Sequence, residues 1–263
     1  MATRKREKEL ARAKYERQQA RRHKRSASQR ALHIGIGIAV AVVIVLAIVG
    51  IGLANRSTSL EATASEAASP STSAATPATP VTCTSPGTPR TNVETFASAP
   101  ATPGTLPTTM TLRTNCGDIV IALNPKAPKT VASEAFLAQQ GFYANTSCHR
   151  LTTNIIYVLQ CGDPKGDGSG GPGYTVPDEN LPGSGDANYP AGTVAMANAG
   201  PGTAGSQFFL VYQDSTLPPD YTIWGTITEG LDIVKGVAAI GTKNVNGDGA
   251  PTQPVFITSA AAS

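Results

Sequence analysis

The side chains most often used for covalent catalysis are scarce in this 263-residue chain. Beyond residue 54, His149 is the only histidine, and Cys148 directly precedes it. Neighbouring residues on a strand point to opposite faces, so these two side chains cannot form a thiolate–imidazole pair with each other. The chain also has no Gly-x-Ser-x-Gly motif. Hydrolysis of the Ser–His or Cys–His kind is therefore not expected.

Motifs that could hold a cofactor fail in their context. Gly168–Gly173 has the Gly-x-Gly-x-x-Gly spacing of a dinucleotide site, but Pro172 obstructs the helix that such a site needs. Asn244–Gly249 resembles half of a calcium loop, yet its twelfth position is Val255 rather than Glu, which favours a surface turn. The cysteines contain no Cys-x-x-Cys pair, which argues against structural zinc. We expect no metal and no other cofactor.

Gly192–Tyr212 carries the polar and aromatic residues best suited to holding a peptide. We expect a strand at Thr193–Ala197, a loop of glycine and small polar residues at Asn198–Gly205, and a second strand at Gln207–Tyr212. A polar ledge beside an aromatic ring could grip an extended peptide. The alternative is a β-hairpin that packs its two phenylalanines into a core. This stretch alone leaves both interpretations open.

Four separated motifs occur in order along the second half of the chain: Cys148–Leu151, Val158–Asp163, Met196–Pro201 and Gly205–Phe209. In this order and spacing they resemble the cyclophilin family of peptidyl-prolyl cis-trans isomerases. The resemblance covers about residues 109 to 258 and includes Ala127–Val131. It implies isomerase activity on proline-containing polypeptides without a cofactor.

The resemblance also implies a role for each residue that aligns with the family's site. Arg150 is the implied catalytic arginine, and Gln160 is the glutamine that orients it. The implied substrate-binding residues form a proline pocket and an adjoining peptide ledge, and they are Tyr157, Val158, Phe209, Leu217, Ala197, Asn198 and Gln207, with Tyr221 in the place of the family's pocket histidine.

Several positions depart from the family pattern. Two extra residues separate Arg150 from Gln160, so Tyr157 is assigned by counting back from Gln160, and it replaces the usual phenylalanine. Thr216 stands where a pocket tryptophan is expected. These departures leave an alternative function open, a membrane-tethered adaptor or holdase that binds proline peptides with little catalysis. Glu134 occupies a helix position that is often apolar, and the sequence does not explain it.

Prolyl isomerisation suits these residue types. Rotation about an X–Pro bond is slow because amide resonance sets a barrier of roughly 18–20 kcal/mol. An enzyme needs only to bind the twisted amide more tightly than either planar form. In the twisted amide the prolyl nitrogen regains a lone pair. The permanently charged guanidinium of Arg150 can donate a hydrogen bond to it.

Short strands and two helices are expected to position these residues. Helices are predicted at Ala127–Gln140 and Leu231–Ile240. Over residues 106–263 the pattern predicts a mainly β domain of about eight strands and two helices, either a closed antiparallel barrel or a sandwich. The family resemblance implies the first of these, a closed eight-stranded antiparallel barrel capped by two α-helices. The strands with the clearest pattern are Ile119–Leu123, Thr146–Thr152, Tyr157–Cys161, Thr193–Ala197, Gln207–Tyr212, Tyr221–Ile227 and Pro254–Thr258.

The chain has four cysteines, Cys83, Cys116, Cys148 and Cys161. Outside the cytoplasm they could form disulfides, and the sequence leaves all three pairings open. The family resemblance places Cys148 and Cys161 on neighbouring strands, which makes that disulfide possible. Cys83 would then pair with Cys116. Free buried thiols are the alternative.

The first 105 residues differ from the rest of the chain. Residues 1–31 form a basic arm with 12 Lys or Arg against three Glu. Residues 32–54 carry no charge at neutral pH apart from any fraction on His33, and their 23 residues suffice for a transmembrane helix. Residues 55–105 are rich in Ala, Ser, Thr and Pro, as in an extended stalk. This layout resembles the membrane-anchored cyclophilins of actinobacteria.

The charge pattern predicts the orientation of this single-pass protein. The positive-inside rule places the basic arm in the cytoplasm and the isomerase domain outside the cell membrane. The arm could contact anionic lipid headgroups, or it could be a solvated helix or disordered segment. A cleaved signal peptide is the competing interpretation of residues 32–54. Binding to nucleic acid is not expected.

Overall fold

The computed structural model of the chain describes residues 81–85, 87–90 and 93–263. The predicted basic arm, the predicted transmembrane helix and the first part of the predicted stalk lie outside these residues. Within the described part, no helix has the length and apolar character needed to cross a bilayer.

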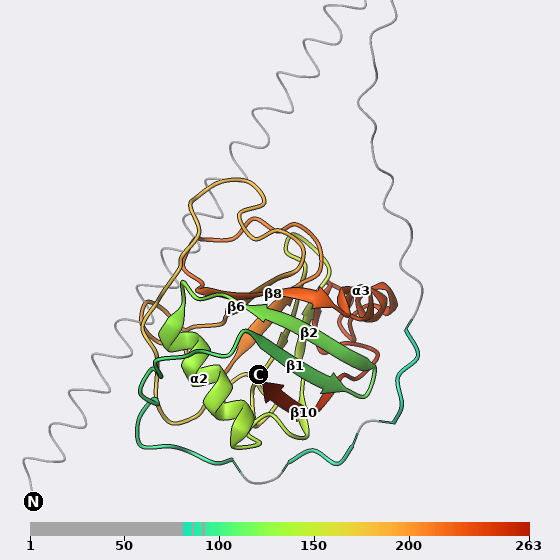
Figure 1. Ribbon diagram of the computed structural model, residues 1–263. Coiled ribbons are helices and arrows are strands. Elements are labelled where there is room, and N and C mark those ends of the chain that lie inside the picture. Colours follow the sequence, from blue (N-terminus) through green and yellow to red (C-terminus); the bar gives the residue numbers. More distant parts are fainter. Residues whose placement is uncertain (1–80, 86, 91–92) are drawn as a thin grey trace, which may run out of the picture. The chain divides into compact units, whose positions relative to one another are not determined.

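Ten strands of the described region form one antiparallel sheet in the order β3-β10-β1-β2-β8-β6-β7-β5-β4-β9 (Figure 1). The helices of this region are α2, Pro128–Gln139, and α3, Leu231–Ile240. The strands are β1 Thr109–Thr114, β2 Gly117–Leu123, β3 Thr146–Ser147, β4 Arg150–Thr152, β5 Val158–Cys161, β6 Thr193–Met196, β7 Phe208–Val211, β8 Ile223–Glu229, β9 Asp248–Gly249 and β10 Phe256–Ala262.

The mainly β class and both helices are confirmed, but in the described region the predicted closed eight-stranded barrel is a curled antiparallel sheet of ten strands. The predicted strand Thr146–Thr152 divides into β3, which pairs with β10, and β4, which pairs with β5 and β9. Only two residues, Cys148 and His149, separate β3 from β4, although β3 is the first strand of the sheet order and β4 is the last but one. The described sheet is therefore curled, and this short link rather than a hydrogen-bonded ladder joins β3 to β4.

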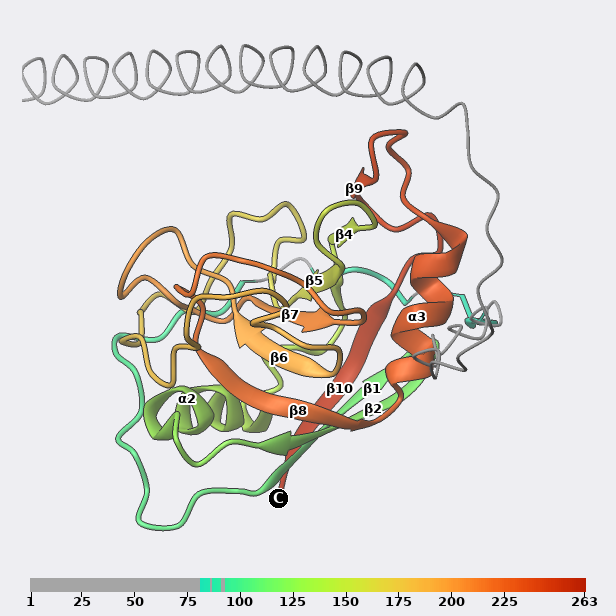
Figure 2. The same ribbon diagram turned by 90° about the horizontal axis from the view of Figure 1, so that it is seen from above.

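The two helices lie on opposite sides of the curled sheet (Figure 2). Helix α2 packs on β10 and begins with Pro128, whose ring suits the first turn of a helix. Helix α3 packs on β2 and ends at Ile240, and the next residue, Gly241, caps it with a φ of 90°. The helix bounds predicted for α3 match the observed ones.

Both faces of the central strands are covered, because apolar residues of β5, β6 and β7 point alternately to two clusters. The inner core, inside the curl, includes Trp224, Tyr143 and Phe208, all fully buried. The cluster on the opposite face, here called the outer cluster, consists of Val158, Tyr189, Ala195, Phe209 and Val211, with Ala197, Leu217, Tyr221 and Ile223 packed against it. Phe208 and Phe209 thus belong to different clusters, as period-two alternation requires.

Glu134, unexplained by the sequence, lies buried in the inner core. The Tyr143 hydroxyl donates a hydrogen bond to its Oε2 at 2.5 Å, while its Oε1 has no partner among the described residues. Burial raises the pKa of Glu134 to about 8, and the Tyr143 hydrogen bond opposes this only in part. The carboxyl group is thus favoured in its neutral form inside the fold.

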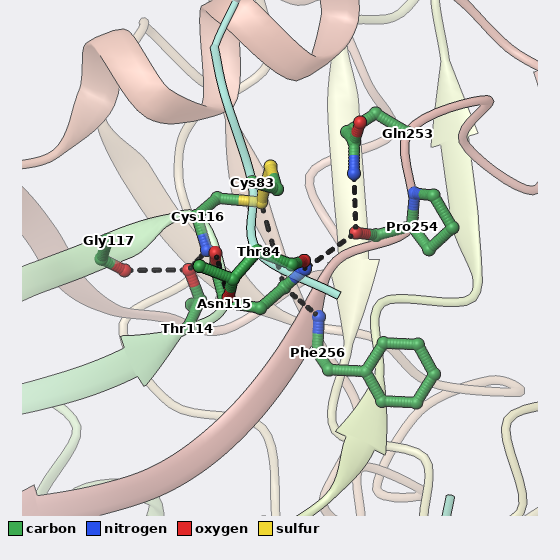
Figure 3. The surroundings of a disulfide bond; sticks show 9 residues. All are labelled: Cys83, Thr84, Thr114, Asn115, Cys116, Gly117, Gln253, Pro254 and Phe256. Carbon is green, nitrogen blue, oxygen red and sulfur yellow. Dashed lines mark hydrogen bonds between the residues drawn. A yellow bond between two sulfur atoms is a disulfide. The ribbon is translucent and has the colours of Figure 1, made fainter. Parts of the chain in front are cut away.

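The described part of the predicted stalk lies along the domain. A disulfide joins Cys83 to Cys116, the residue before β2 (Figure 3). Asn115 reinforces it, because its side-chain amide donates to Thr84 O at 2.9 Å and accepts from Phe256 N at 2.8 Å. Further along, Phe96 packs edge-on against Phe136 of α2 with ring centroids 4.9 Å apart. The backbone N–H of Phe96 also donates to Pro172 O at 2.7 Å.

Candidate active site

Strand pairing places the predicted catalytic residues in one row on the outer face of the sheet. Arg150 of β4 lies opposite Gln160 of β5, which lies opposite Phe209 of β7, which lies opposite Ala195 of β6. Phe209 and Ala195 belong to the outer cluster, so all four side chains share that face. Leu151, next to Arg150, points the other way and is fully buried in the inner core.

A chain of hydrogen bonds runs along one side of this row. The Nη1 of Arg150 donates to Gln160 Oε1 at 3.3 Å. The Nε2 of Gln160 donates to Gln207 Oε1 at 2.9 Å. The Nε2 of Gln207 in turn donates to the carbonyl oxygens of Gly168 and Gly170 at 3.0 and 2.9 Å. The glycine run after β5 therefore fixes the rotamer of Gln207, and through it that of Gln160.

A cavity of about 230 Å³ opens over the row. Arg150, Gln160 and Asn198 are its polar lining residues, and the others are apolar or aromatic. It is lined by Arg150, Ile156, Val158, Gln160, Ala197, Asn198, Phe209, Leu217 and Tyr221. The structure thus brings eight of the ten predicted catalytic and substrate-binding residues to one cavity.

Tyr157, predicted for the pocket, does not line this cavity. Its ring packs edge-on against Tyr212, with centroids 5.9 Å apart, and it borders the inner core. Ile156 takes the place on the cavity wall. The reason is the alternation of side chains along a strand. Val158 and Gln160 face the cavity, so Ile156 shares their face and Tyr157 points to the other one. Counting back from Gln160 in steps of two residues would have identified Ile156 from the sequence.

Gln207 lies beside this cavity rather than in it. It lines a second cavity of about 430 Å³, which shares Gln160, Ala197 and Asn198 with the first. The glycine run and Thr203 line the far part of the second cavity. The side chain of Asn198 donates to Asp220 O at 2.7 Å and accepts from Gly200 N at 3.2 Å, so it shapes the loop between β6 and β7.

The aromatic wall rests on a residue that the sequence did not single out. Phe209 and Tyr221 pack edge-on with ring centroids 5.4 Å apart, and the fully buried Tyr189 lies about 6 Å from both. The Tyr189 hydroxyl donates to Tyr221 O at 3.1 Å, and burial raises its pKa to about 12. Thr216, where a tryptophan was expected, accepts from Ala187 N at 2.9 Å. No short motif in the sequence marks Tyr189.

Arg150 also makes an ion pair that the sequence did not predict. Its Nε and Nη2 donate to Asp248 Oδ1 and Oδ2 at 2.7 and 2.8 Å, a bidentate contact. The hydrogen bond to Asp248 raises the pKa of the guanidinium further above its usual range, and the same bond lowers the pKa of Asp248. Asp248 lies in the stretch interpreted as a surface turn, 98 residues from Arg150. The guanidinium of Arg150 therefore stays fully charged at neutral pH.

The second disulfide joins Cys148 to Cys161, so all four cysteines are paired as the family resemblance suggested. It fastens the residue two before Arg150 to the residue after Gln160. No group of three or more His, Cys, Asp or Glu side chains in the described ranges could hold a metal ion.

Comparison with known proteins agrees with this geometry. A protein-family model described as "Cyclophilin type peptidyl-prolyl cis-trans isomerase/CLD" matches residues 109–262, more than half of the chain. The chain belongs to the cyclophilin family. The matched range begins at β1 and ends with β10, so it contains the whole curled sheet and the row that carries Arg150.

Two curated mycobacterial cyclophilins show the extent of the similarity. The "Probable peptidyl-prolyl cis-trans isomerase B" of Mycobacterium tuberculosis is 51% identical over 157 residues, which cover 55% of this chain and 51% of that protein. The protein of the same name from Mycobacterium leprae is 50% identical over 157 residues, covering 55% and 53%. The chain therefore matches only about half the length of these relatives.

A solved cyclophilin shares the architecture. The crystal structure of a cyclophilin-type isomerase from Cryptosporidium parvum, obtained in the presence of the dipeptide Ala-Pro, is 27% identical. It superposes with a TM-score of 0.51 and covers 59% of this chain and 98% of that one. The similarity thus spans more than half of this chain and nearly all of that one.

Proposed function

We propose that this cyclophilin catalyses cis–trans isomerisation of X–Pro bonds in polypeptides, with Arg150 as the catalytic residue. The observation that carries the proposal is a charged guanidinium in the same cavity as the apolar side chains of Val158, Phe209 and Leu217. The cavity gives the proline ring a place out of water, while the guanidinium supplies a donor beside it. Family membership and the Ala-Pro dipeptide named for the Cryptosporidium structure support a proline-containing substrate.

In this mechanism the apolar side chains of Val158, Phe209 and Leu217 hold the pyrrolidine ring. The guanidinium of Arg150 donates a hydrogen bond to the prolyl nitrogen, whose lone pair is available only when the amide is twisted. The interaction therefore lowers the barrier without stabilising either planar form, which is the requirement for catalysis. Gln160 and Gln207 keep the guanidinium aimed at the cavity.

Residues on the second cavity complete the proposed substrate site. Ala197 and Asn198 line both cavities and Gln207 lines the larger one, so a peptide whose proline occupies the smaller cavity would extend its backbone along them. Fixing the backbone on one side of the proline makes rotation occur on the other side. Ile156 and Tyr221 close the remaining wall of the smaller cavity.

We also propose that the domain works outside the cell membrane, on proteins that fold there. Residues 32–54 would cross the membrane, with the basic arm in the cytoplasm and in contact with anionic lipid. Two disulfides suit an oxidising compartment better than the cytoplasm, which supports this orientation. Treating spheroplasts with a protease tests this orientation. We expect the protease to digest the domain and to leave the basic arm protected.

A chymotrypsin-coupled or NMR exchange assay on a proline peptide tests the activity with the full chain. We expect Arg150→Ala to lower kcat/KM by about 10²–10³-fold, as is typical when a preorganised donor to the transition state is removed. The thermal midpoint should change little, because the Arg150 side chain is 39% exposed. If the Arg150→Ala variant has the same kcat/KM as the wild type, the proposed mechanism is wrong. Peptide binding without rate enhancement by the wild type would indicate an adaptor instead.

A further inference from the structure

Asp248 sits on a loop far from Arg150 in sequence but directly against it in space. Strand β9, which begins at Asp248, pairs with β4 at the end of the sheet (Figure 2). The loop is tied down on both sides: Thr153 N donates to Gly247 O at 2.8 Å, and Lys243 N donates to Ala250 O at 2.8 Å. The Asn244 amide also donates to Asp248 O at 2.8 Å. These hydrogen bonds hold the backbone of Asp248 in place, and thereby keep its carboxylate beside Arg150.

The ion pair leaves Arg150 with a defined set of free donors. A guanidinium has five N–H groups in a rigid plane. Asp248 accepts from Nε and Nη2, and Gln160 accepts from Nη1. One N–H on Nη1 and one on Nη2 remain without an acceptor among the described residues. With two edges of the plane occupied, rotation about the end of the side chain is blocked, and the remaining donors keep one direction.

We propose that Asp248 is a positioning residue for isomerisation, which orients the Arg150 guanidinium from the side opposite Gln160. The proposal rests on the proposed catalytic role of Arg150. Without Asp248, Gln160 alone would hold a long side chain through one hydrogen bond of 3.3 Å. The guanidinium would then sample several orientations, and only a fraction of them would aim a donor at the prolyl nitrogen.

The opposing electrostatic effect is smaller. A carboxylate beside the guanidinium reduces the positive potential felt by the substrate, but both side chains are more than a third exposed, so water screens this effect. Orientation therefore decides the sign, and removing the carboxylate slows the reaction rather than accelerating it.

The test uses the full chain and compares Asp248→Asn and Asp248→Ala with Val245→Ala. Val245 lies in the same loop, is fully exposed and contacts neither Arg150 nor the cavity, so its variant controls for general changes in the loop. We expect both Asp248 variants to lower kcat about fivefold, the effect of one exposed ion pair, with little change in KM. Val245→Ala should match the wild type. Asp248→Glu should recover part of the loss, since it restores a carboxylate.

Salt concentration gives a readout that a merely structural role would not move. The ratio of wild-type to Asp248→Asn kcat should shrink as sodium chloride rises from about 0.05 to 1 M, because salt weakens the ion pair in the wild type alone. The proposal is overturned if Asp248→Ala and Asp248→Asn have the same kcat as the wild type. It is also overturned if Val245→Ala lowers kcat as much as the Asp248 variants do. Arg150→Ala separates the two failures. If that variant is slow while the Asp248 variants are fast, only the positioning role is lost. If it is as fast as the wild type, the proposed mechanism itself fails.

Discussion

The two faces of strands β5 to β7 differ in what their side chains surround. On the inner face Phe208 meets Tyr143 and Trp224 edge-on, at ring-centroid distances of 5.8 and 5.7 Å, and all three are fully buried. On the outer face Phe209 meets Tyr221 edge-on and Tyr189 at a tilted angle, and this smaller cluster borders an open cavity. Adjacent residues of the same type thus serve different purposes: one face supplies stability, and the other supplies a shaped apolar wall.

The largest expected effect comes from breaking the inner face. Phe208→Ala removes a fully buried ring from between two others, so we expect it to lower the free energy of unfolding by about 3–5 kcal/mol. Chemical denaturation followed by Trp224 fluorescence measures this. The protein that remains folded should keep a kcat near that of the wild type. A selective loss of kcat with unchanged stability would contradict the division between the two faces.

The next effect concerns the buried carboxyl group of Glu134. Burial raises the pKa of Glu134 from 4.5 to about 8, so the folded state holds its proton more tightly than the unfolded state does. The resulting stability is fully present below about pH 4.5 and is lost as the pH rises toward 8. We therefore expect the unfolding free energy to fall by a few kcal/mol between pH 5 and 8.

Glu134→Gln is the matched control for this pH dependence. The amide oxygen can still accept the Tyr143 hydrogen bond, but the side chain no longer titrates. The slope of stability against pH should flatten in this variant over the same window. Equal slopes in wild type and variant would show that the Glu134 carboxyl is not the group responsible.

The smallest of these effects on stability is expected on the outer face. Phe209→Ala should cost about 2 kcal/mol of unfolding free energy, because the cavity beside it already admits water. Its effect on activity should be larger than that of Phe208→Ala, about tenfold in kcat/KM, since the proline ring loses an apolar wall worth roughly 1.5 kcal/mol. Both variants assayed side by side test the comparison directly. If Phe208→Ala and Phe209→Ala lose activity and stability in the same proportion, the two faces do not differ in the way described.

Local patterns in the sequence predicted much of this arrangement. Period-two alternation and glycine punctuation located the central strands, and proline and glycine located both helices. The family motifs located Arg150 and Gln160, which face each other across β4 and β5. What alternation could not show was that the strand beginning at Thr146 passes from one end of the sheet to the other. That division depends on which partners pair with each half.

The misses share a physical cause. Tyr157 was assigned by counting along an alignment, whereas the pleat of the strand decides which face a side chain takes. Asp248 and Tyr189 lie in segments without regular patterning and reach the site only through long-range folding. Glu134 seemed misplaced in a helix because its partner, Tyr143, lies beyond the end of that helix. Contacts between distant segments leave little trace in one sequence.

The Cys83–Cys116 disulfide has a mechanical consequence. Tension applied to the chain before Cys83 would pass through the sulfur–sulfur bond to Cys116, so residues 84–115 are outside the covalent load path. The force then enters the sheet at the turn between β1 and β2, where strand pairing is continuous from Thr114–Gly117 to Thr109–Ala122. Phe96 and its contacts with α2 and Pro172 would carry no load. A domain pulled by its N-terminal side would thus keep this segment in place.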